Sequence, residues 1–335
     1  MNDLPSAPGE ALAMRSAGAL AYVEAELDGL RQALTDLPDW APSRMLLAEA
    51  AWLRERLGEI AAAWERKLVV AIAGPSGAGK STLLNALAGR ELSPTGLRRP
   101  TTREVVLYVG ARSDADPLLD HLGEGAAQVH VAAEAASLEQ LILVDTPDTN
   151  TLPENQRLLA RVLERADLVL AVFPAQNPKM QDNLAFLEPF VQHLPEGAVI
   201  PVLNMVDRVP RSQLDEIVAD FVAALERNWK RGPGRVYLIS ALEGAGAQSV
   251  RDEEPLHTLN ELPLLAEALF SSLNRAGEVV DRRLAHAEHL LDLFRGHCAE
   301  VLEASAEQRA LARAALATLR TDLSLCLGES LTDEA

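Results

Sequence analysis

The sequence predicts an α/β fold in which helices cover both faces of a mostly parallel sheet, with a helical bundle formed from the N- and C-terminal helices. The sheet is indicated by continuous apolar runs between residues 68 and 240, which alternate with helical patterns. Such runs are typical of parallel strands that are buried on both faces. The bundle is indicated by apolar residues that recur at steps of three and four near both ends of the chain.

The strands are predicted from the apolar runs, in chain order. They are expected at 68–74, 105–109, 141–145, 168–173, 199–204 and 236–240. Helical patterns separate most of them, at 81–89, 154–165, 181–193 and 212–228. Because strands that alternate with helices form mostly parallel sheets, we expect one such sheet within residues 67–250.

Residues 1–66 are predicted to form a helical hairpin. One apolar stripe runs over Leu20–Leu34 and a second over Leu46–Trp64, and a turn with two prolines separates them at 37–43. Two helices alone bury little apolar surface, so this hairpin needs a partner.

The region 251–335 is predicted to be helical from Pro263 nearly to its end. A heptad-like apolar stripe runs over Val280–Val301 and continues over Leu311–Leu323, after a break that we predict near Glu303–Glu307. We interpret these helices as the partner of the N-terminal hairpin, and the alternative is that they coat the sheet. His286 and His289 share a helix face without an evident third ligand, which predicts surface residues rather than a metal site.

The composition bears on which classes of function fit the chain. A formal net charge of −18 argues against binding to a nucleic-acid backbone and disfavours docking on anionic lipid. Cys298 and Cys326 lack ligand spacing and are predicted to be reduced thiols in helices. No stretch approaches the roughly 18 apolar residues of a membrane span, and no basic cluster precedes an apolar run at the N-terminus. We therefore expect a cytoplasmic protein, with no nucleic-acid partner and no indication of membrane contact beyond an apolar tip.

The stretch 74-GPSGAGKST-82 fits the pattern G-x-x-x-x-G-K-S, directly after one predicted strand and before a predicted helix. In that context, glycines let backbone N–H groups surround a nucleotide β-phosphate at a helix N-terminus. Lys80 is expected to bridge the β- and γ-phosphates, and Ser81 to ligate Mg²⁺. The predicted phosphate-binding residues are Gly74, Ser76, Gly77, Ala78, Gly79, Lys80, Ser81 and Thr82.

A polar, basic loop follows and ends in Pro-Thr-Thr-Arg before the strand at 105–109. This arrangement resembles the first switch of GTPases related to Era and TrmE, and its Pro-Thr-Gly also resembles bacterial dynamin-like proteins. The resemblance implies that Thr101 or Thr102, with Thr102 favoured, closes over Mg²⁺ and the γ-phosphate. Arg98 and Arg99 would either neutralise γ-phosphate charge or form a solvated basic loop.

The next element of the resemblance is 141-LILVDTPDTN-150, where the family carries D-x-x-G. Asp145 is expected to hold a Mg²⁺-bound water at the end of its strand. Asp148 stands in place of the glycine that offers its backbone N–H to the γ-phosphate. A carboxylate there brings negative charge toward the phosphate, which predicts weaker triphosphate binding or an altered switch.

Two further elements resemble a guanine site. The stretch 199-VIPVLNMVDRVP-210 matches N-K-x-D except that Met205 replaces the lysine, so Asn204 and Asp207 are expected to meet the base. Asp207 would accept hydrogen bonds from guanine donors that adenine lacks. Ser240 and Ala241, at the end of 236–240, resemble the short loop whose backbone contacts the guanine oxygen.

Together these elements resemble a bacterial P-loop GTPase of the Era/TrmE-like and dynamin-like group, over residues 66–245. The resemblance implies hydrolysis of GTP to GDP, with Mg²⁺ as cofactor, and a switch acting on the helical bundle or on a homodimer interface across the nucleotide face. It assigns catalysis to Lys80, Thr101 or Thr102 and Asp145, and the metal to Ser81, Thr102 and Asp145. Gly77 offers no side chain where relatives place a serine or an asparagine, which puts cation-assisted hydrolysis in doubt. A GTP-binding scaffold with little hydrolysis and a P-loop ATPase or kinase remain the alternatives.

Overall fold

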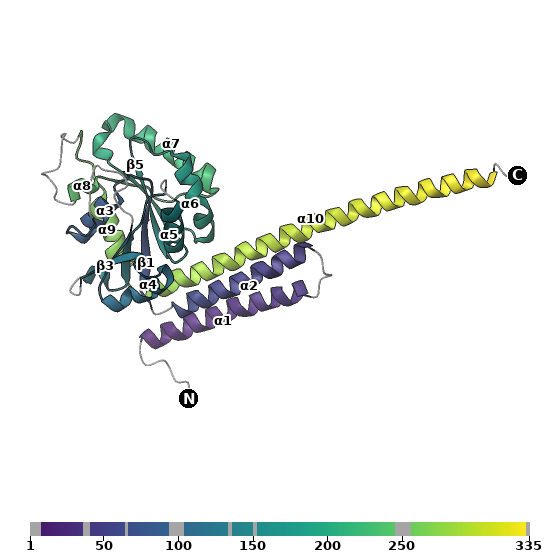
Figure 1. The fold of residues 1–335 in the computed structure, drawn as a ribbon, viewed down its shortest axis with the longest axis horizontal. Coiled ribbons are helices and arrows are strands. Elements are labelled where there is room, and N and C mark those ends of the chain that lie inside the picture. The colour runs from purple at the N-terminus through teal and green to yellow at the C-terminus, as the bar shows by residue number, and fades with distance from the viewer. Residues whose placement is uncertain are drawn as a thin grey trace. The chain divides into compact units, whose positions relative to one another are not determined.

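The structure is a computed structural model in which two compact units are distinguished (Figure 1). It describes residues 8–35, 41–63, 66–93, 104–132, 136–149, 153–244 and 256–332. Unit 1 comprises Met1–Leu20 and Glu59–His289, and unit 2 comprises Ala21–Gly58 and Leu290–Ala335. Unit 1 therefore contains the whole sheet, whereas unit 2 combines segments from both ends of the chain.

Unit 1 is built on one sheet whose seven described strands are ordered β3-β2-β4-β1-β5-β6-β7. The strands are β1 Leu68–Ala73, β2 Val105–Val109, β3 Ala127–Val131, β4 Leu141–Asp145, β5 Leu168–Pro174, β6 Val199–Asn204 and β7 Tyr237–Ile239. All neighbouring strands pair in parallel except β2 and β4, which pair antiparallel. The predicted mostly parallel sheet is confirmed.

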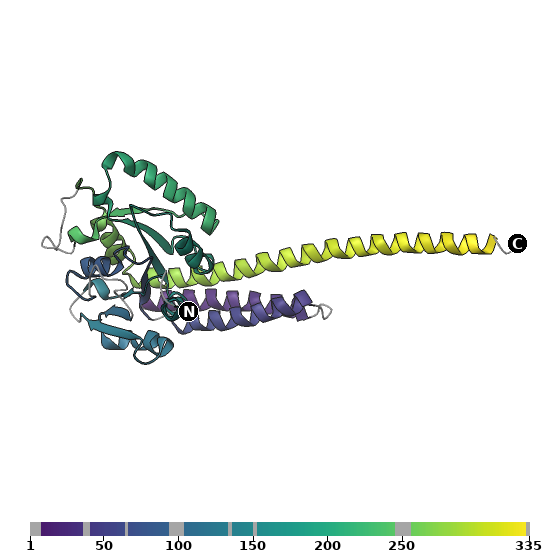
Figure 2. The ribbon, with the colours of Figure 1, turned by 45° about the horizontal axis from the view of Figure 1, so that its top comes forward.

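Helices cover both faces of this sheet (Figures 1 and 2). The helices of unit 1 are α3 Lys80–Ala88, α4 Asp116–Leu122, α5 Pro153–Leu163, α6 Gln181–His193, α7 Arg211–Trp229, α8 Ala241–Gly244 and α9 Leu262–Glu267, followed by a π-helical turn at Ala268–Ser272. Three helices run from one unit into the other, namely α1 Pro8–Thr35, α2 Ala41–Ala62 and α10 Ala276–Thr332.

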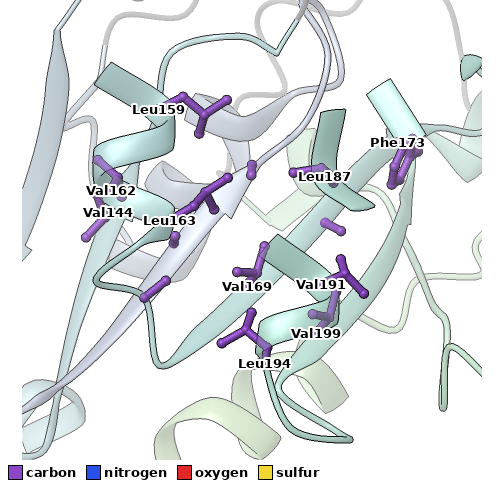
Figure 3. Packing of buried hydrophobic residues seen from close by; sticks show 14 of the residues in the cluster. Val144, Leu159, Val162, Leu163, Val169, Phe173, Leu187, Val191, Leu194 and Val199 are labelled. Carbon is purple, nitrogen blue, oxygen red and sulfur yellow. The ribbon is translucent and has the colours of Figure 1, made fainter. Parts of the chain in front are cut away.

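The strands read as continuous apolar runs because alternate residues are buried on opposite faces. In β1, Val70 and Ile72 belong to one apolar cluster with α3 and α9, and Ala71 and Ala73 belong to the other. Figure 3 shows that second cluster, in which side chains of α5 and α6 pack over β4, β5 and β6. With both faces covered, no polar residue is needed between the apolar ones.

Sequence patterns missed two neighbouring elements, α4 and β3. The side chains of β3 are half-buried or exposed, and its sequence AQVHV mixes polar and apolar residues. It lies at the edge of the sheet, parallel to β2. An edge strand of this kind carries no continuous apolar run, so the pattern that found the other six strands could not find it.

The predicted break near Glu303–Glu307 is wrong, because α10 is continuous through it. The segment consists of good helix formers around one serine, and the Ser305 hydroxyl donates to the Val301 carbonyl at 2.6 Å within the helix. The polar residues thus interrupt the apolar stripe without interrupting the helix.

The surface placement predicted for His286 and His289 is also wrong. His286 is 5% exposed, and His289 is half-buried, with its Nε2 2.8 Å from the Gln192 carbonyl oxygen. Both residues lie on the part of α10 that belongs to unit 1. They are packing residues, and periodicity alone does not tell a buried histidine from a solvated one.

In unit 2, segments of α1, α2 and α10 pack together. The buried side chains include Val23, Leu27, Leu46, Leu53, Leu57, Leu291, Phe294 and Cys298. Arg295 pairs with Glu26 at 2.6 Å, and His297 Nδ1 lies 2.6 Å from Glu49 Oε2. Burial raises the pKa of the Cys298 thiol to about 11, which keeps it protonated at neutral pH. Helices from the two chain ends thus share a core, while the boundaries at residues 66 and 250 stay a prediction.

Among the described residues, no helix is both long enough and apolar enough to cross a bilayer.

The part of α10 in unit 1 is anchored to the sheet by Arg283, whose side chain is 3% exposed. Its guanidinium donates to the carbonyl oxygens of Ala63, Arg66 at 2.6 Å and Lys67 at 3.0 Å, and it pairs with Asp167 at 3.3 Å. The Asp167 carboxylate also accepts the backbone N–H of Val69 at 2.8 Å. This one cation therefore satisfies three described carbonyl groups between α2 and β1.

Replacing Arg283 with Met should lower the free energy of unfolding by about 3 kcal/mol, because Asp167 and three carbonyls lose a buried partner. Urea unfolding followed by tryptophan fluorescence measures this. The matched control is Arg211→Met, since Arg211 is 55% exposed and pairs only at the surface with Asp215; it should change stability by less than about 1 kcal/mol. Equal effects of the two substitutions would contradict the anchoring role.

Candidate nucleotide site

The predicted phosphate loop connects β1 to α3, and two of its glycines are fixed by close contacts. A Cβ on Gly74 would lie 2.1 Å from the Val172 carbonyl oxygen. A Cβ on Gly79 would lie 2.3 Å from Asn204 Nδ2, and Gly79 has φ +85°. No larger residue fits either position without moving backbone or the Asn204 side chain. Gly77 is exposed with φ +77°, whereas Ser76 and Thr82 are half-buried.

Lys80 lies on the first turn of α3 and points back under the loop. Its side chain is only 4% exposed, and its ammonium donates to the carbonyl oxygens of Gly74 at 3.1 Å and Pro75 at 3.3 Å. It also forms an ion pair with Asp148, whose side chain is 5% exposed. The carboxylate that replaces the switch glycine is thus in contact with the lysine expected to bind phosphate.

Asp145 ends β4 beside the same helix and is fully buried. Its Oδ2 accepts the hydroxyls of Ser81 at 2.6 Å and Ser93 at 2.9 Å. Its Oδ1 is buried and has no hydrogen-bond partner within the described part of the chain. Burial raises the pKa of Asp145, while the Lys80 charge and the two hydroxyls oppose that rise.

These oxygens fit a small, hard cation. Mg²⁺ prefers carboxylate and hydroxyl oxygens and retains several waters, and Asp145 Oδ1 offers a buried acceptor beside the Ser81 hydroxyl. A cation would also compensate the desolvation that raises the carboxyl pKa. The residues present therefore fit the predicted metal, in which Ser81 and Asp145 would be the ligands or the holders of its waters.

Sequence reasoning missed Asn85, which fixes the start of the first switch loop. Its Oδ1 accepts the backbone N–H groups of Leu92 at 2.8 Å and Ser93 at 3.0 Å, and its Nδ2 donates to the Ser93 carbonyl at 2.8 Å. The available signal was an asparagine on the buried side of the helix in STLLNALAG. Thr101 and Thr102, predicted for this loop, lie outside the described residues, as do Arg98 and Arg99.

The segment after Asp145 packs against the phosphate loop. Thr146 donates its hydroxyl to the Ile72 carbonyl at 2.8 Å, and the Thr149 N–H donates to the Gly74 carbonyl at 3.2 Å. The Thr149 hydroxyl donates to the Asn183 carboxamide oxygen in α6. Asp148 lies between these two anchored threonines, which explains why its carboxylate faces Lys80.

Asn204 joins the phosphate loop to the two loops expected to hold the base. Its Nδ2 donates to the Ala78 carbonyl at 2.8 Å, and its Oδ1 accepts the N–H groups of Met205 at 2.8 Å and Ala241 at 3.0 Å. Met205 has φ +64°, a left-handed conformation that few side chains adopt. The structure thus brings the three predicted loops together around one carboxamide.

Asp207 follows at the end of this loop, 7% exposed. Its carboxylate makes no hydrogen bond or ion pair with the residues that the structure describes.

Ser240 is also buried, and Asn260, which sequence reasoning missed, shapes its loop. Asn260 accepts the Ser240 N–H at 3.0 Å and donates to the Ser240 carbonyl at 2.9 Å. An asparagine in a polar linker carries no signal that would have singled it out.

All these groups lie at one edge of the sheet, where the carboxyl ends of β1, β4, β5, β6 and β7 meet. That edge is where open α/β sheets bind ligands. It presents a glycine-rich loop with a lysine, a buried carboxylate beside a hydroxyl, and, on the loop after β6, a carboxylate that has no partner among the described residues. The arrangement can hold a phosphate chain at one end and a base at the other.

Comparison with known proteins points to the same region. Residues 69–206 match the sequence model of the family described as 50S ribosome-binding GTPase. GTPase Era of Agrobacterium fabrum is 27% identical over 203 residues, which are 58% of this chain and 53% of that protein. The tRNA modification GTPase MnmE of Pseudomonas savastanoi pv. phaseolicola is 31% identical over 186 residues, which are 55% of this chain and 36% of that protein.

One solved structure, of an oligomerised bacterial dynamin pair, overlaps with 94% of this chain and 52% of its own, at a TM-score of 0.45 and 16% identity. The chain spans about half the length of the Era relative and about a third of the MnmE relative. The matched segment runs from β1 to the start of the loop after β6, so it includes the phosphate loop, Asp145 and Asn204. Residues 69–206 of this chain therefore match the sequence model of a 50S ribosome-binding GTPase domain, and this part of the chain is similar to Era and MnmE.

Proposed function

We propose that this chain binds guanine nucleotide with Mg²⁺, hydrolyses GTP to GDP and phosphate, and uses the nucleotide state as a conformational switch on its helices or on a homodimer interface. The observation that carries this proposal is the Asn204 junction. It sets the Asp207 loop and the Ser240 loop against the phosphate loop, at one edge of the sheet.

Guanine is the base that suits Asp207. A carboxylate with no described partner is an acceptor for two donors, and guanine offers its N1–H and its exocyclic amine side by side. Adenine presents no such pair, so binding it would leave a desolvated carboxylate without hydrogen bonds. Met205 would lay an apolar side chain over the base in place of a lysine stem.

Mg²⁺ would be held by Ser81 and Asp145, with Thr102, or else Thr101, completing the site from the first switch loop. The bound cation would neutralise charge on the β- and γ-phosphates. The chain's own residues orient the Asp145 carboxylate, because the Ser81 and Ser93 hydroxyls both donate to its Oδ2. The Asn85 clamp gives the first switch loop a fixed starting point.

Hydrolysis requires Lys80 to face the phosphates, so its ion pair with Asp148 has to open first. The rate is therefore expected to be low, and a GTP-binding scaffold with little hydrolysis is the second candidate that the same observation supports. An ATPase or kinase is disfavoured because the loops after β6 and β7 are built around Asn204 and leave Asp207 without a partner in the described part of the chain. The formal charge of −18 supports the expectation of no nucleic-acid partner, and a cytoplasmic location stays a prediction from the N-terminal sequence and its apolar runs.

The base assignment is tested by Asp207→Ala. In competition against a fluorescent GDP analogue with Mg²⁺, the wild type should prefer GTP over ATP by roughly 100-fold or more, and the variant should lose most of that preference. Asp215→Ala is the control, because Asp215 is 92% exposed on α7. If ATP competes as well as GTP in the wild type, the guanine assignment fails and only the phosphate loop remains.

Turnover is tested by Lys80→Ala with phosphate release measured under excess GTP. Removing the cation that faces the transferred phosphoryl group should lower kcat by roughly 100-fold or more. Activity that persists in the variant would belong to another site or to a contaminant. A wild type that binds GTP but releases no phosphate over many hours would instead support the scaffold.

A further inference from the structure

The ion pair between Lys80 and Asp148 is the most deeply buried one in the described chain, with side chains 4% and 5% exposed. It lies inside the phosphate loop, since the same ammonium also donates to the Gly74 and Pro75 carbonyls. The Asp148 carboxylate thus occupies a position inside the loop where a phosphate group of the nucleotide is expected to bind.

This contact removes positive charge from the site. A buried carboxylate in contact with a buried ammonium neutralises it far more effectively than a solvated one, because little water screens the pair. The backbone N–H groups of the loop and the α3 N-terminus are not affected and still face a β-phosphate. What the pair reduces is the Lys80 charge expected between the β- and γ-phosphates, and a triphosphate, which carries more negative charge, depends on that charge more than a diphosphate does.

Asp148 is also held in place by its neighbours. The Thr149 N–H donates to the Gly74 carbonyl at 3.2 Å, and the Thr149 hydroxyl donates to Asn183. Gln156 of α5 donates to the Thr149 carbonyl at 2.9 Å. These contacts hold the backbone next to Asp148 against the phosphate loop and connect it to α5 and α6.

We propose that Asp148 determines how many phosphates the site accepts, acting as an internal anion that favours a nucleoside diphosphate over a triphosphate. A diphosphate binds while the Lys80–Asp148 pair stays closed. A triphosphate has to displace the carboxylate from Lys80, and the two anions cannot share one buried ammonium without repulsion. This inference rests on the proposed function, because it assumes that the ligand is a guanine nucleotide.

The test compares GDP with the non-hydrolysable βγ-imido analogue of GTP by isothermal titration calorimetry, with Mg²⁺ in excess. Wild-type protein should bind GDP at least tenfold more tightly than the analogue. In Asp148→Asn, which keeps the shape and removes the charge, and in Asp148→Gly, the ratio of the two dissociation constants should shift at least tenfold toward the analogue. The control Asp215→Asn makes the same chemical change on the surface and should leave the ratio unaltered.

The outcomes separate this inference from the proposed function. Wild-type protein that binds the analogue as tightly as GDP overturns the inference, even if neither Asp148 variant folds. So does an unchanged ratio in whichever variant folds, judged by circular dichroism. In either case, guanine binding that depends on Asp207 leaves the proposed function intact. Binding of neither nucleotide overturns both.

Discussion

The geometry of the candidate site depends on the carboxamide of Asn204. One side chain bonds the phosphate loop, its own loop and the loop after β7, three segments that are far apart in the sequence. The contact is so close that position 79 has to be glycine, since any Cβ would meet the Asn204 nitrogen at 2.3 Å. The loops predicted to hold the phosphates and the base are therefore joined directly through one side chain, which fixes the spacing between them in the folded chain.

The candidate site contains more buried negative charge than is usual for a phosphate-binding site. Lys80 is shared between loop carbonyls and Asp148, and Asp145 is buried with one oxygen unpaired among the described residues. Two carboxylates and one ammonium leave the nucleotide-free site net negative. A divalent cation would more than offset this negative charge. On the proposed function, cation binding, phosphate number and the position of the Asp148 carboxylate would be coupled by electrostatics.

Sequence patterns predicted the six strands that are buried on both faces, because such strands leave continuous apolar runs. They did not predict β3, whose sequence AQVHV suits an exposed edge, nor the continuity of α10 through Ser305. At the site, the phosphate loop, Asp145, Asn204 and Asp207 were found because their residue types recur at fixed spacing. Asn85 and Asn260 were not, because each acts by bonding backbone groups that only the folded chain brings within reach. The contact between Lys80 and Asp148 could not be predicted either, although the sequence shows that an aspartate stands where relatives carry a glycine.

The Arg283 anchor has a consequence for how the helices and the nucleotide edge communicate. Arg283 donates a hydrogen bond to the Lys67 carbonyl and pairs with Asp167, and these two residues immediately precede β1 and β5. The candidate site lies at the opposite ends of the same strands. At about 3.3 Å per residue, six residues of β1 separate the two by roughly 20 Å. The Arg283 contacts and the candidate site are therefore connected through β1 and β5 and not through direct side-chain contact. β1 and β5 are the elements that connect the Arg283 contacts at one edge of the sheet to the candidate site at the other.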